Sequence, residues 1–454
     1  MTKADTAEAL ATLAAWNASV RLDAVPDAIR ARAALILADD LGAMIAARHE
    51  PELIALRDGV AASAGHAEAS VLDGSGTRLD RYSAALSNGT AADWCELDGG
   101  YRRVVCHAAL YCISALIAEA EARDATLDDV LLALLVGYET VARVGEAFHF
   151  ADLVLHPHGG LATIGAAASV AKLRGDDAAT THDAIATAAT LVLPGPFNHA
   201  VEGALVRNAW PGLCAQNGLR AADWARIGVT GNANSLYEVF AGIFGGTARP
   251  AALCEGLGAR WAVSDCYHKM HACCQYGHST VEAVLEAIGT AGALSPDAIR
   301  AIHVDTHPKG RKLDNDAPAT TLASKFSVQH IAAATAVFGA AGSAAFHADT
   351  LTEPALAALR TRVTIGPFEP ELAAPNDRPA RVAITLSDGT RLSGECLSAR
   401  GGPDRPFAQD AIEAKTTANF DGLYAPLLDA LLDAARGGRA AGATGWRALL
   451  APGA

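Results

Sequence analysis

The chain has few aromatic residues and fewer basic than acidic residues. Aromatic side chains make up 6% of its 454 residues, and 36 Lys and Arg face 50 Asp and Glu, for a formal net charge of −14. Binding to anionic membranes and non-specific binding to nucleic acid both need a basic surface, so this charge argues against both. The net charge does not exclude binding of a small anionic ligand, because a pocket can be locally basic on an acidic protein.

Long apolar runs are missing as well. No segment reaches the roughly 18 consecutive apolar residues that a membrane-spanning helix needs. The first residues, MTKADTAEALATLAAWNAS, favour an amphipathic helix over a signal peptide. Nine scattered cysteines, an odd number, fit reduced thiols rather than a disulfide framework. We therefore expect a cytoplasmic protein with no membrane segment.

Several motifs of known chemistry are also absent. The chain has no G-x-G-x-x-G after a predicted strand, no Walker A motif and no G-x-S-x-G, so nucleotide binding and an α/β-hydrolase are unsupported. A run of His and Cys between His268 and His278 invites a metal site. Structural zinc prefers two separated pairs of ligands, and this run is crowded into one segment. We expect no metal there.

What the sequence does contain is alanine-rich, helical periodicity over its first 265 residues. Alanine has the best helix propensity and lets helices pack closely. A short strand is suggested only near 69–72. The predicted helices are 27–49, 79–94, 106–122, 127–148, 159–175, 181–192 and 213–227.

The pattern changes after Cys266. Predicted strands cover 298–308, 361–372 and a hairpin at 380–398, where Asp388-Gly389 is a strong turn signal. Two helices, 279–292 and 327–341, lie between them, and the tail at 408–450 is helical again. We predict a mainly α fold. A large all-α helical domain comprises residues 1–265 and 405–454, and a smaller α+β lid domain with an antiparallel sheet comprises 266–404. A ligand would bind in the cleft between them.

The segment from Glu96 to His107 groups ionisable residues between two predicted helices. Arg102 and Arg103 would hold carboxylates in bidentate fashion. Asp98 or Glu96 would orient a histidine or act as a base. The alternative is an ordinary solvated loop between helices.

Three later segments carry further candidates. His156-Pro-His158 opens a predicted helix, where burial would lower the pKa of an imidazole and suit it to act as a neutral base. Arg207 precedes another helix and would clamp a carboxylate, although a surface arginine is the simpler interpretation. Lys269 stands at the predicted domain junction and would point into the cleft. Alternatively, His268 is exposed and the cysteines beside Lys269 belong to the core.

Taken in order, these segments resemble the MmgE/PrpD family over nearly the whole chain. Further matches lie outside the candidate segments. The motifs that carry the resemblance are Ala38-Asp-Asp-Leu-Gly42, Ser87-Asn-Gly-Thr-Ala-Ala92, Glu96-Leu-Asp-Gly-Gly-Tyr-Arg102, Gly137-Tyr138-Glu139, His156-Pro157, Arg207 with Gly212, Lys269, Cys273-Cys274, His278 and Ser324-Lys-Phe-Ser327.

The resemblance implies roles for specific residues. Departures from the family pattern are Gly99 and Gly100 in the first loop, Ala108 after His107, and His271-Ala272. The family histidine after Lys269 matches either Cys274 or His278. The implied catalytic residues are His107, His156, Lys269, Asp98, Glu96 and Tyr138, and the implied substrate-binding residues are Arg102, Arg103, Arg207 and His278.

The resemblance also implies an activity. The family includes 2-methylcitrate dehydratases, cis-aconitate decarboxylases and an iminodisuccinate epimerase, which work as homodimers without metals or organic cofactors. We therefore expect a homodimeric, cofactor-free lyase acting on a small di- or tricarboxylate by proton transfer next to a carboxylate. The alternatives are an epimerase or isomerase of such an acid and a non-catalytic relative that binds one.

Overall fold

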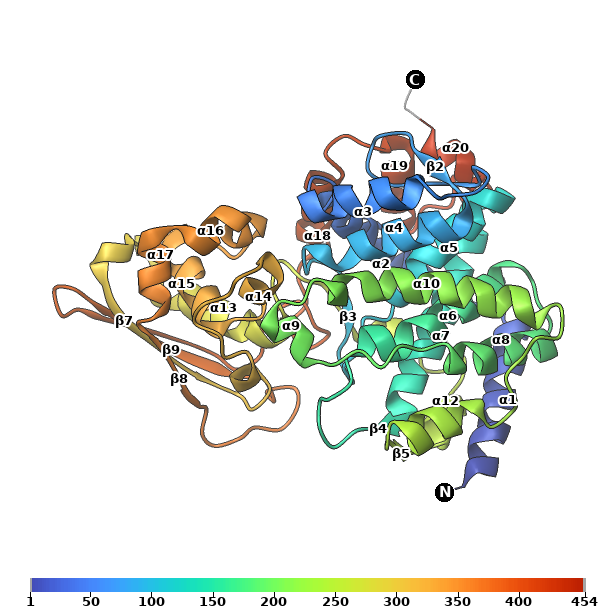
Figure 1. Ribbon diagram of the computed structural model, residues 1–454, viewed down its shortest axis with the longest axis horizontal. Coiled ribbons are helices and arrows are strands. Elements are labelled where there is room, and N and C mark those ends of the chain that lie inside the picture. Colours follow the sequence, from blue (N-terminus) through green and yellow to red (C-terminus); the bar gives the residue numbers. More distant parts are fainter. Residues whose placement is uncertain (1, 452–454) are drawn as a thin grey trace.

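The computed structural model describes residues 2–451, and its chain is mainly helical, as predicted. Figure 1 shows a large helical body beside a smaller body that contains a sheet. The helices of the large body before the smaller one are α1 (Lys3–Ser19), α2 (Asp27–Ala46), α3 (Pro51–Ala61), α4 (Arg81–Trp94), α5 (Leu110–Arg123), α6 (Leu127–Ala147), α7 (Pro157–Leu173), α8 (Ala178–Thr190), α9 (Asn198–Glu202), α10 (Val206–Ala225), α11 (Ser235–Tyr237) and α12 (Ala251–Cys254).

Short antiparallel strand pairs tie loops of this body together. Each strand of the three pairs named below has two residues. Such strands are too short to show the period-2 pattern by which a strand is predicted from sequence. The pairs are β1 (Ala69–Ser70) with β2 (Arg78–Leu79), β3 (Gly100–Tyr101) with β6 (Cys266–Tyr267), and β4 (Phe148–His149) with β5 (Thr247–Ala248).

Two helices of the large body cross at a pair of glycines. A Cβ atom added to Gly89 of α4 would lie 2.6 Å from the Cα of Gly212 on α10, so any side chain there would push the helices apart. Asp93 follows Gly89 by one helical turn, and Arg207 precedes Gly212 by a similar step. The close crossing therefore brings an acidic and a basic side chain from distant parts of the chain together.

The smaller body consists of helices packed against one face of a four-stranded sheet. Its strand order is β10-β9-β7-β8, and β7 pairs with β8 in parallel. The prediction of an antiparallel sheet is therefore wrong for the β7–β8 pair. The connection from β7 to β8 is a long helical crossover, which can return the chain in the same direction. Its elements are α13 (His278–Ile288), α14 (Thr321–Lys325), α15 (Val328–Phe338), α16 (Ala348–Thr352), α17 (Pro354–Arg360), β7 (Ile299–Thr306), β8 (Val363–Pro367), β9 (Ala380–Leu386) and β10 (Arg391–Cys396).

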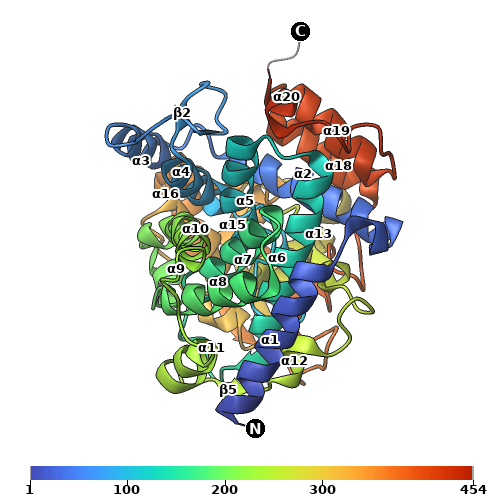
Figure 2. The same ribbon diagram turned by 90° about the vertical axis from the view of Figure 1, so that its right-hand side faces the viewer.

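The chain then returns to the helical body. α18 (Gln409–Phe420) and α19 (Ala425–Ala435) pack on α2, and α20 (Trp446–Leu450) follows at the same end (Figure 2). The tail is helical, as predicted, and the domain limits stay a prediction. Among residues 2–451, no helix combines the length and apolarity needed to cross a membrane.

Candidate active site

The β3–β6 ribbon holds the loop after α4 against the segment that leads into the smaller body. Gly100 pairs with Tyr267, and a Cβ atom at Gly100 would lie 2.3 Å from the ring of that tyrosine. The neighbouring Gly99 N–H donates to Asp40 Oδ1 at 2.7 Å. Close packing thus explains glycine at both places where the sequence departs from the family pattern.

Asp98 and His107 form a hydrogen-bonded pair at the start of this site. Oδ2 of Asp98 lies 2.5 Å from Nδ1 of His107. Burial acts to raise the pKa of the Asp98 carboxyl, but the charge of Lys269 and the hydrogen bond from His107 outweigh it and hold this pKa well below the usual value. The carboxylate is therefore ionised, accepts from Nδ1–H and leaves Nε2 of His107 for proton exchange.

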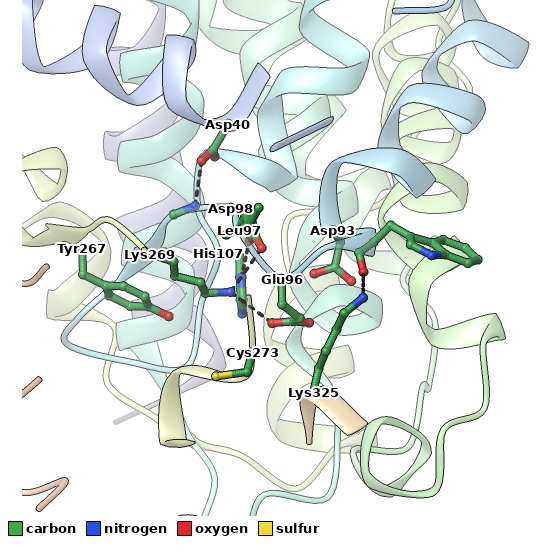
Figure 3. Close-up of polar contacts among 12 residues, drawn as sticks. Asp40, Asp93, Glu96, Leu97, Asp98, His107, Tyr267, Lys269, Cys273 and Lys325 are labelled. Carbon is green, nitrogen blue, oxygen red and sulfur yellow. Dashed lines mark hydrogen bonds and ion pairs between the residues drawn. The ribbon is translucent and has the colours of Figure 1, made fainter. Parts of the chain in front are cut away.

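Lys269 lies between two carboxylates of the loop, as Figure 3 shows. Its Nζ donates to Glu96 Oε2 at 3.0 Å and to Asp98 Oδ1 at 3.2 Å, and its side chain is fully buried. Burial alone would lower the pKa of this ammonium, but Asp98 and Glu96 raise it well above its usual value. Lys269 is thus a permanent counter-charge for the acidic loop.

Arg207 neutralises the other side of the acidic loop. Its Nη1 lies 2.7 Å from Glu96 Oε1 and also hydrogen-bonds Asp93. The burial of Glu96 is outweighed by the charges of Arg207 and Lys269, which lower the pKa of Glu96 to about 2. Burial, with repulsion from Glu96 and Asp98, raises the pKa of Asp93 well above its usual value. Two ionised carboxylates therefore balance two cations.

Glu96 also has an unusual backbone. Its φ angle is 52°, in the left-handed region that residues other than glycine and asparagine rarely adopt. The turn directs its side chain between Arg207 and Lys269. Lys325 from α14 supports the same turn, because its Nζ donates to the Trp94 carbonyl at 2.7 Å (Figure 3). A strained backbone held by several partners is typical of a functional site.

Two histidines stand at the start of α7. His156 caps this helix, and Arg207 Nε donates to its Nε2 at 3.2 Å. His158 lies 3.0 Å from Asp93 Oδ1 through Nε2 and 2.9 Å from the Tyr111 hydroxyl through Nδ1. Burial first, and the charge of Arg207 second, lower the pKa of both imidazoles well below the usual value. Both are therefore neutral near pH 7, as predicted for a base at this helix start.

The acidic cluster also has the spacing of a metal site. Ligand atoms of Asp93, Glu96 and Asp98 lie within 4.8 Å of one another, as do those of Asp93, His107 and His158. Arg207 and Lys269 already bind these carboxylates. A divalent ion would have to displace both cations, so this set of side chains fits a divalent metal poorly.

An inner cavity opens beside this cluster and connects to a larger outer cavity. The inner cavity has a volume of about 30 Å³, room for only one or two waters. The outer cavity has about 900 Å³ and shares Val104, Val105, Pro157 and Arg378 with the inner one. The inner cavity is lined by Glu96, Tyr101, Val104, Val105, Cys106, His107, His156, Pro157, Phe197, Arg207, Tyr267, Cys274, Gln275, Tyr276, Phe326 and Arg378.

The structure brings together most of the residues that the sequence singled out, but only some of them line the inner cavity. Glu96, His107, His156 and Arg207 line the inner cavity. Asp98 and Lys269 lie directly behind them, bonded to His107 and Glu96.

Four other predicted residues lie farther away. Arg102 and Arg103 line the outer cavity, where Arg102 binds Asp377 and Arg103 is half-exposed. Tyr138 is buried and lines neither cavity. His278 is also buried, and its Nε2 lies 3.1 Å from the Cys273 carbonyl.

Of the two candidates for the family histidine position, Cys274 is the one that lines the inner cavity. Burial raises the pKa of its thiol to about 12, so it stays protonated at neutral pH and is no nucleophile. Its small, neutral side chain stands where a histidine would have added a third imidazole to the cavity lining.

Several residues of the site had no strong signal in the sequence. Asp93 sits in an alanine-rich helix, and a lone acid on such a buried face was the one clue to it. Phe197, Tyr276 and Phe326 look like ordinary core aromatics. Arg378 lies in a proline-rich loop more than 100 residues beyond Lys269, and only the fold brings it to the site.

Comparison with known proteins gives the family of the chain. A model of the MmgE/PrpD N-terminal domain matches residues 11–253, and one of the MmgE/PrpD C-terminal domain matches residues 271–429. The chain is 25% identical over 442 residues to the cis-aconitate decarboxylase-like protein oryM of Aspergillus oryzae, with 89% of each chain covered.

Two further relatives are named cis-aconitate decarboxylase. The one from Aspergillus terreus is 27% identical over 348 residues, covering 70% of this chain and 71% of the relative. The human one is 26% identical over 359 residues, covering 75% and 73%. With both domain models matched in order along most of its length, the chain belongs to the MmgE/PrpD family.

Proposed function

We propose that this protein is a lyase that removes CO₂ or water from a small polycarboxylate in the inner cavity. The family and the relatives named cis-aconitate decarboxylase support lyase chemistry. One observation carries the proposal. His107, which is held by Asp98 and can move a proton, lines the same cavity as Arg207, which can hold a carboxylate.

Decarboxylation would proceed in two parts. The electron pair of the breaking C–C bond stays on the substrate as CO₂ leaves, and the resulting charge spreads into a neighbouring carboxylate or double bond. Arg207 is placed to stabilise that charge. The protonated form of His107 then donates its Nε2 proton to the carbon, while Asp98 holds the ring through Nδ1, and solvent restores the proton afterwards.

Loss of water would use the same residues in the reverse sense. Neutral His107 takes a proton from a carbon next to a carboxylate, Arg207 stabilises the developing enolate charge, and the hydroxyl leaves with a proton from a second acid. In both reactions, Lys269 balances the negative charges of Asp98 and Glu96.

The small size of the inner cavity has a consequence for binding. Because the inner cavity holds only a few waters, a polycarboxylate would need part of the neighbouring outer cavity as well as the inner one. Gln275, Tyr276 and Arg378 from the smaller body form part of its wall. Closure of these residues over the substrate would exclude water from the reacting carbon.

A second candidate is an epimerase or isomerase of a dicarboxylate. The observation that favours it is that His107 and His156 come from different elements and both line the inner cavity. Two bases on opposite faces of one carbon can remove and return a proton with inversion. His156 is neutral, and its Nε2 would serve as the second base once Arg207 turns from it to the substrate.

Proton NMR in D₂O separates these functions. The protein is incubated with citrate, methylcitrate, cis-aconitate and iminodisuccinate-like acids, and His107→Gln serves as the inactive control. Loss of CO₂ or water supports the lyase, and deuterium incorporation without net loss supports the epimerase. Binding of an acid without any exchange would instead identify a non-catalytic relative. Absence of both binding and exchange with all of these acids would contradict the proposal.

Two accompanying features are proposals from the family resemblance. A homodimer is tested by light scattering of the purified chain. Cofactor independence is tested by prolonged dialysis against a chelator, which should leave turnover unchanged if Arg207 and Lys269 provide the charge that a metal would otherwise supply.

A further inference from the structure

One arginine of the smaller body lies at the mouth between the two cavities. Arg378 immediately precedes Pro379 and β9, lines both cavities and is 7% exposed. Its carbonyl accepts a hydrogen bond from Ser279 Oγ at 2.5 Å, which anchors it to α13. Arg207 reaches the inner cavity from α10, in the helical body. Two guanidinium groups from different bodies therefore line one cavity.

The guanidinium of Arg378 has few acceptors for a buried cation. Nη1 donates to the neutral Gln275 Oε1, and Nη2 lies 3.5 Å from the Arg102 carbonyl oxygen. Nε has no hydrogen-bond acceptor within residues 2–451. A buried guanidinium usually binds a carboxylate, since burial of an incompletely paired charge is costly.

The nearest carboxylate is engaged elsewhere. Oδ1 of Asp377 accepts from Arg102 Nη2 at 2.6 Å, and its Oδ2 lies 3.6 Å from Arg378 Nε, longer than a hydrogen bond. The ring of Tyr276 packs against the guanidinium, with its centroid 5.3 Å from Cζ. This contact orients the planar group and leaves its Nε donor for a ligand.

We propose that Arg378 binds one carboxylate of the substrate at the mouth of the inner cavity while Arg207 binds a second one inside it. The inference rests on the proposed function and adds to it that the substrate presents two carboxylates far enough apart to reach both arginines. An arginine fork matches a carboxylate in bidentate geometry. An acid that reaches both arginines also bridges the two bodies and favours the closed arrangement.

Calorimetric titration tests this with three unreactive acids. Propane-1,2,3-tricarboxylate has all three carboxylates, glutarate lacks the central one, and methylsuccinate lacks a terminal one. The wild type should prefer the tricarboxylate over at least one of the two dicarboxylates. Arg378→Gln should weaken tricarboxylate binding by about tenfold to a hundredfold, the scale of a lost charged hydrogen-bond pair, and should abolish that preference.

Two further variants sharpen the test. Arg381→Gln, on β9 and half-exposed with a Glu395 partner, should bind all three acids like the wild type. Arg378→Lys keeps the charge but not the fork, so it should recover part of the affinity, and it decides the question if Arg378→Gln fails to fold. A preference as large as that of the wild type in folded Arg378→Gln, or in Arg378→Lys if the first variant does not fold, would overturn the inference, as would a wild type with no preference.

Turnover of cis-aconitate, measured in parallel, separates this inference from the proposed function. A wild type that binds the tricarboxylate through Arg378 but converts no acid would contradict the lyase and support the inference. A wild type that converts cis-aconitate with a KM unaffected by Arg378→Gln would contradict only the inference.

Discussion

Nδ1 of His107 lies 2.5 Å from Oδ2 of Asp98. This contact joins the segment just before α5 to the acidic loop after α4, which the β3–β6 ribbon holds in place. It selects the tautomer of His107 that carries hydrogen on Nδ1 and leaves Nε2 to exchange a proton in the inner cavity. The same contact holds the ring in place while Nε2 takes up or releases a proton.

Replacement of Asp98 by asparagine tests this relationship. The amide can donate to Nδ1 and stabilise the wrong tautomer, so kcat should fall by about a hundredfold to ten-thousandfold. KM should change little, because Asp98 lies behind the cavity wall. Steady-state rates with the acid identified by NMR measure both. The exposed Asp297→Asn is the control, and a full rate in Asp98→Asn would refute the assigned role.

Lys269→Met should mainly harm stability. It leaves the buried Glu96 and Asp98 without their shared cation, and breaking such a buried pair costs about 3–5 kcal/mol. The thermal midpoint should fall clearly, and activity should fall at least about tenfold. Adding Glu96→Gln removes one of the two carboxylate charges that Lys269 balanced and should restore part of the thermal midpoint. A double variant no more stable than Lys269→Met would show that charge balance is not the reason.

Asp40→Asn should be tolerated, with a benefit that grows with pH. Burial, together with the charges of Asp98 and Asp39, raises the pKa of Asp40 well above 3.8. Above pH 3.8 the unfolded chain releases this proton while the folded chain keeps it, so the wild type loses stability as pH rises toward the folded pKa. Asparagine has no proton to release and still accepts from the Gly99 N–H.

Melting curves at several pH values test the sign of this effect. The thermal midpoint of Asp40→Asn minus that of the wild type should increase from pH 5 to pH 8. Asp40→Ala is the contrast, because it leaves the buried Gly99 N–H without its acceptor at a cost of about 1–3 kcal/mol. A difference between Asp40→Asn and the wild type that stays constant from pH 5 to pH 8 would mean that Asp40 is already ionised in the folded chain.

Gly100→Ala should disturb the site through the ribbon. The new methyl group would lie 2.3 Å from the buried ring of Tyr267, which lines the inner cavity and has little room to move. We expect a thermal midpoint several degrees lower and a reduced kcat/KM. Gly59→Ala is the matched control, since nothing lies within 4 Å of a Cβ there and alanine favours the exposed helix α3. Equal behaviour of the two variants would argue against the packing explanation.

Local periodicity was enough to predict most elements. The predicted helix 127–148 is α6, the predicted strand 298–308 contains β7, and the Asp388-Gly389 turn joins β9 to β10. These elements obey rules that act within a few residues, such as apolar spacing, capping and turn conformation. The parallel pairing of β8 could not be predicted in this way, because both possible directions bury the same side chains.

The residues of the candidate site fall into two similar groups, those with a local signal in the sequence and those that only the fold brings to the site. Glu96, His107, His156 and Arg207 stand in segments whose Gly, Pro and charged residues mark a functional loop, and the structure places them around one cavity. Asp93 and Arg378 stand in segments without such marks. Their importance comes from the partners that α4 and the loop before β9 give them.

The sequence by itself determined the helical character of the chain, its acidic charge, its family and the kinds of side chain available for chemistry, because composition and short-range spacing carry that information. Only the tertiary structure decided which of these groups share a cavity and in which state of charge. Lys269 became a buried counter-charge and His156 a neutral imidazole through burial and contacts between residues far apart in the chain. Those effects depend on distance in space, which local sequence does not specify.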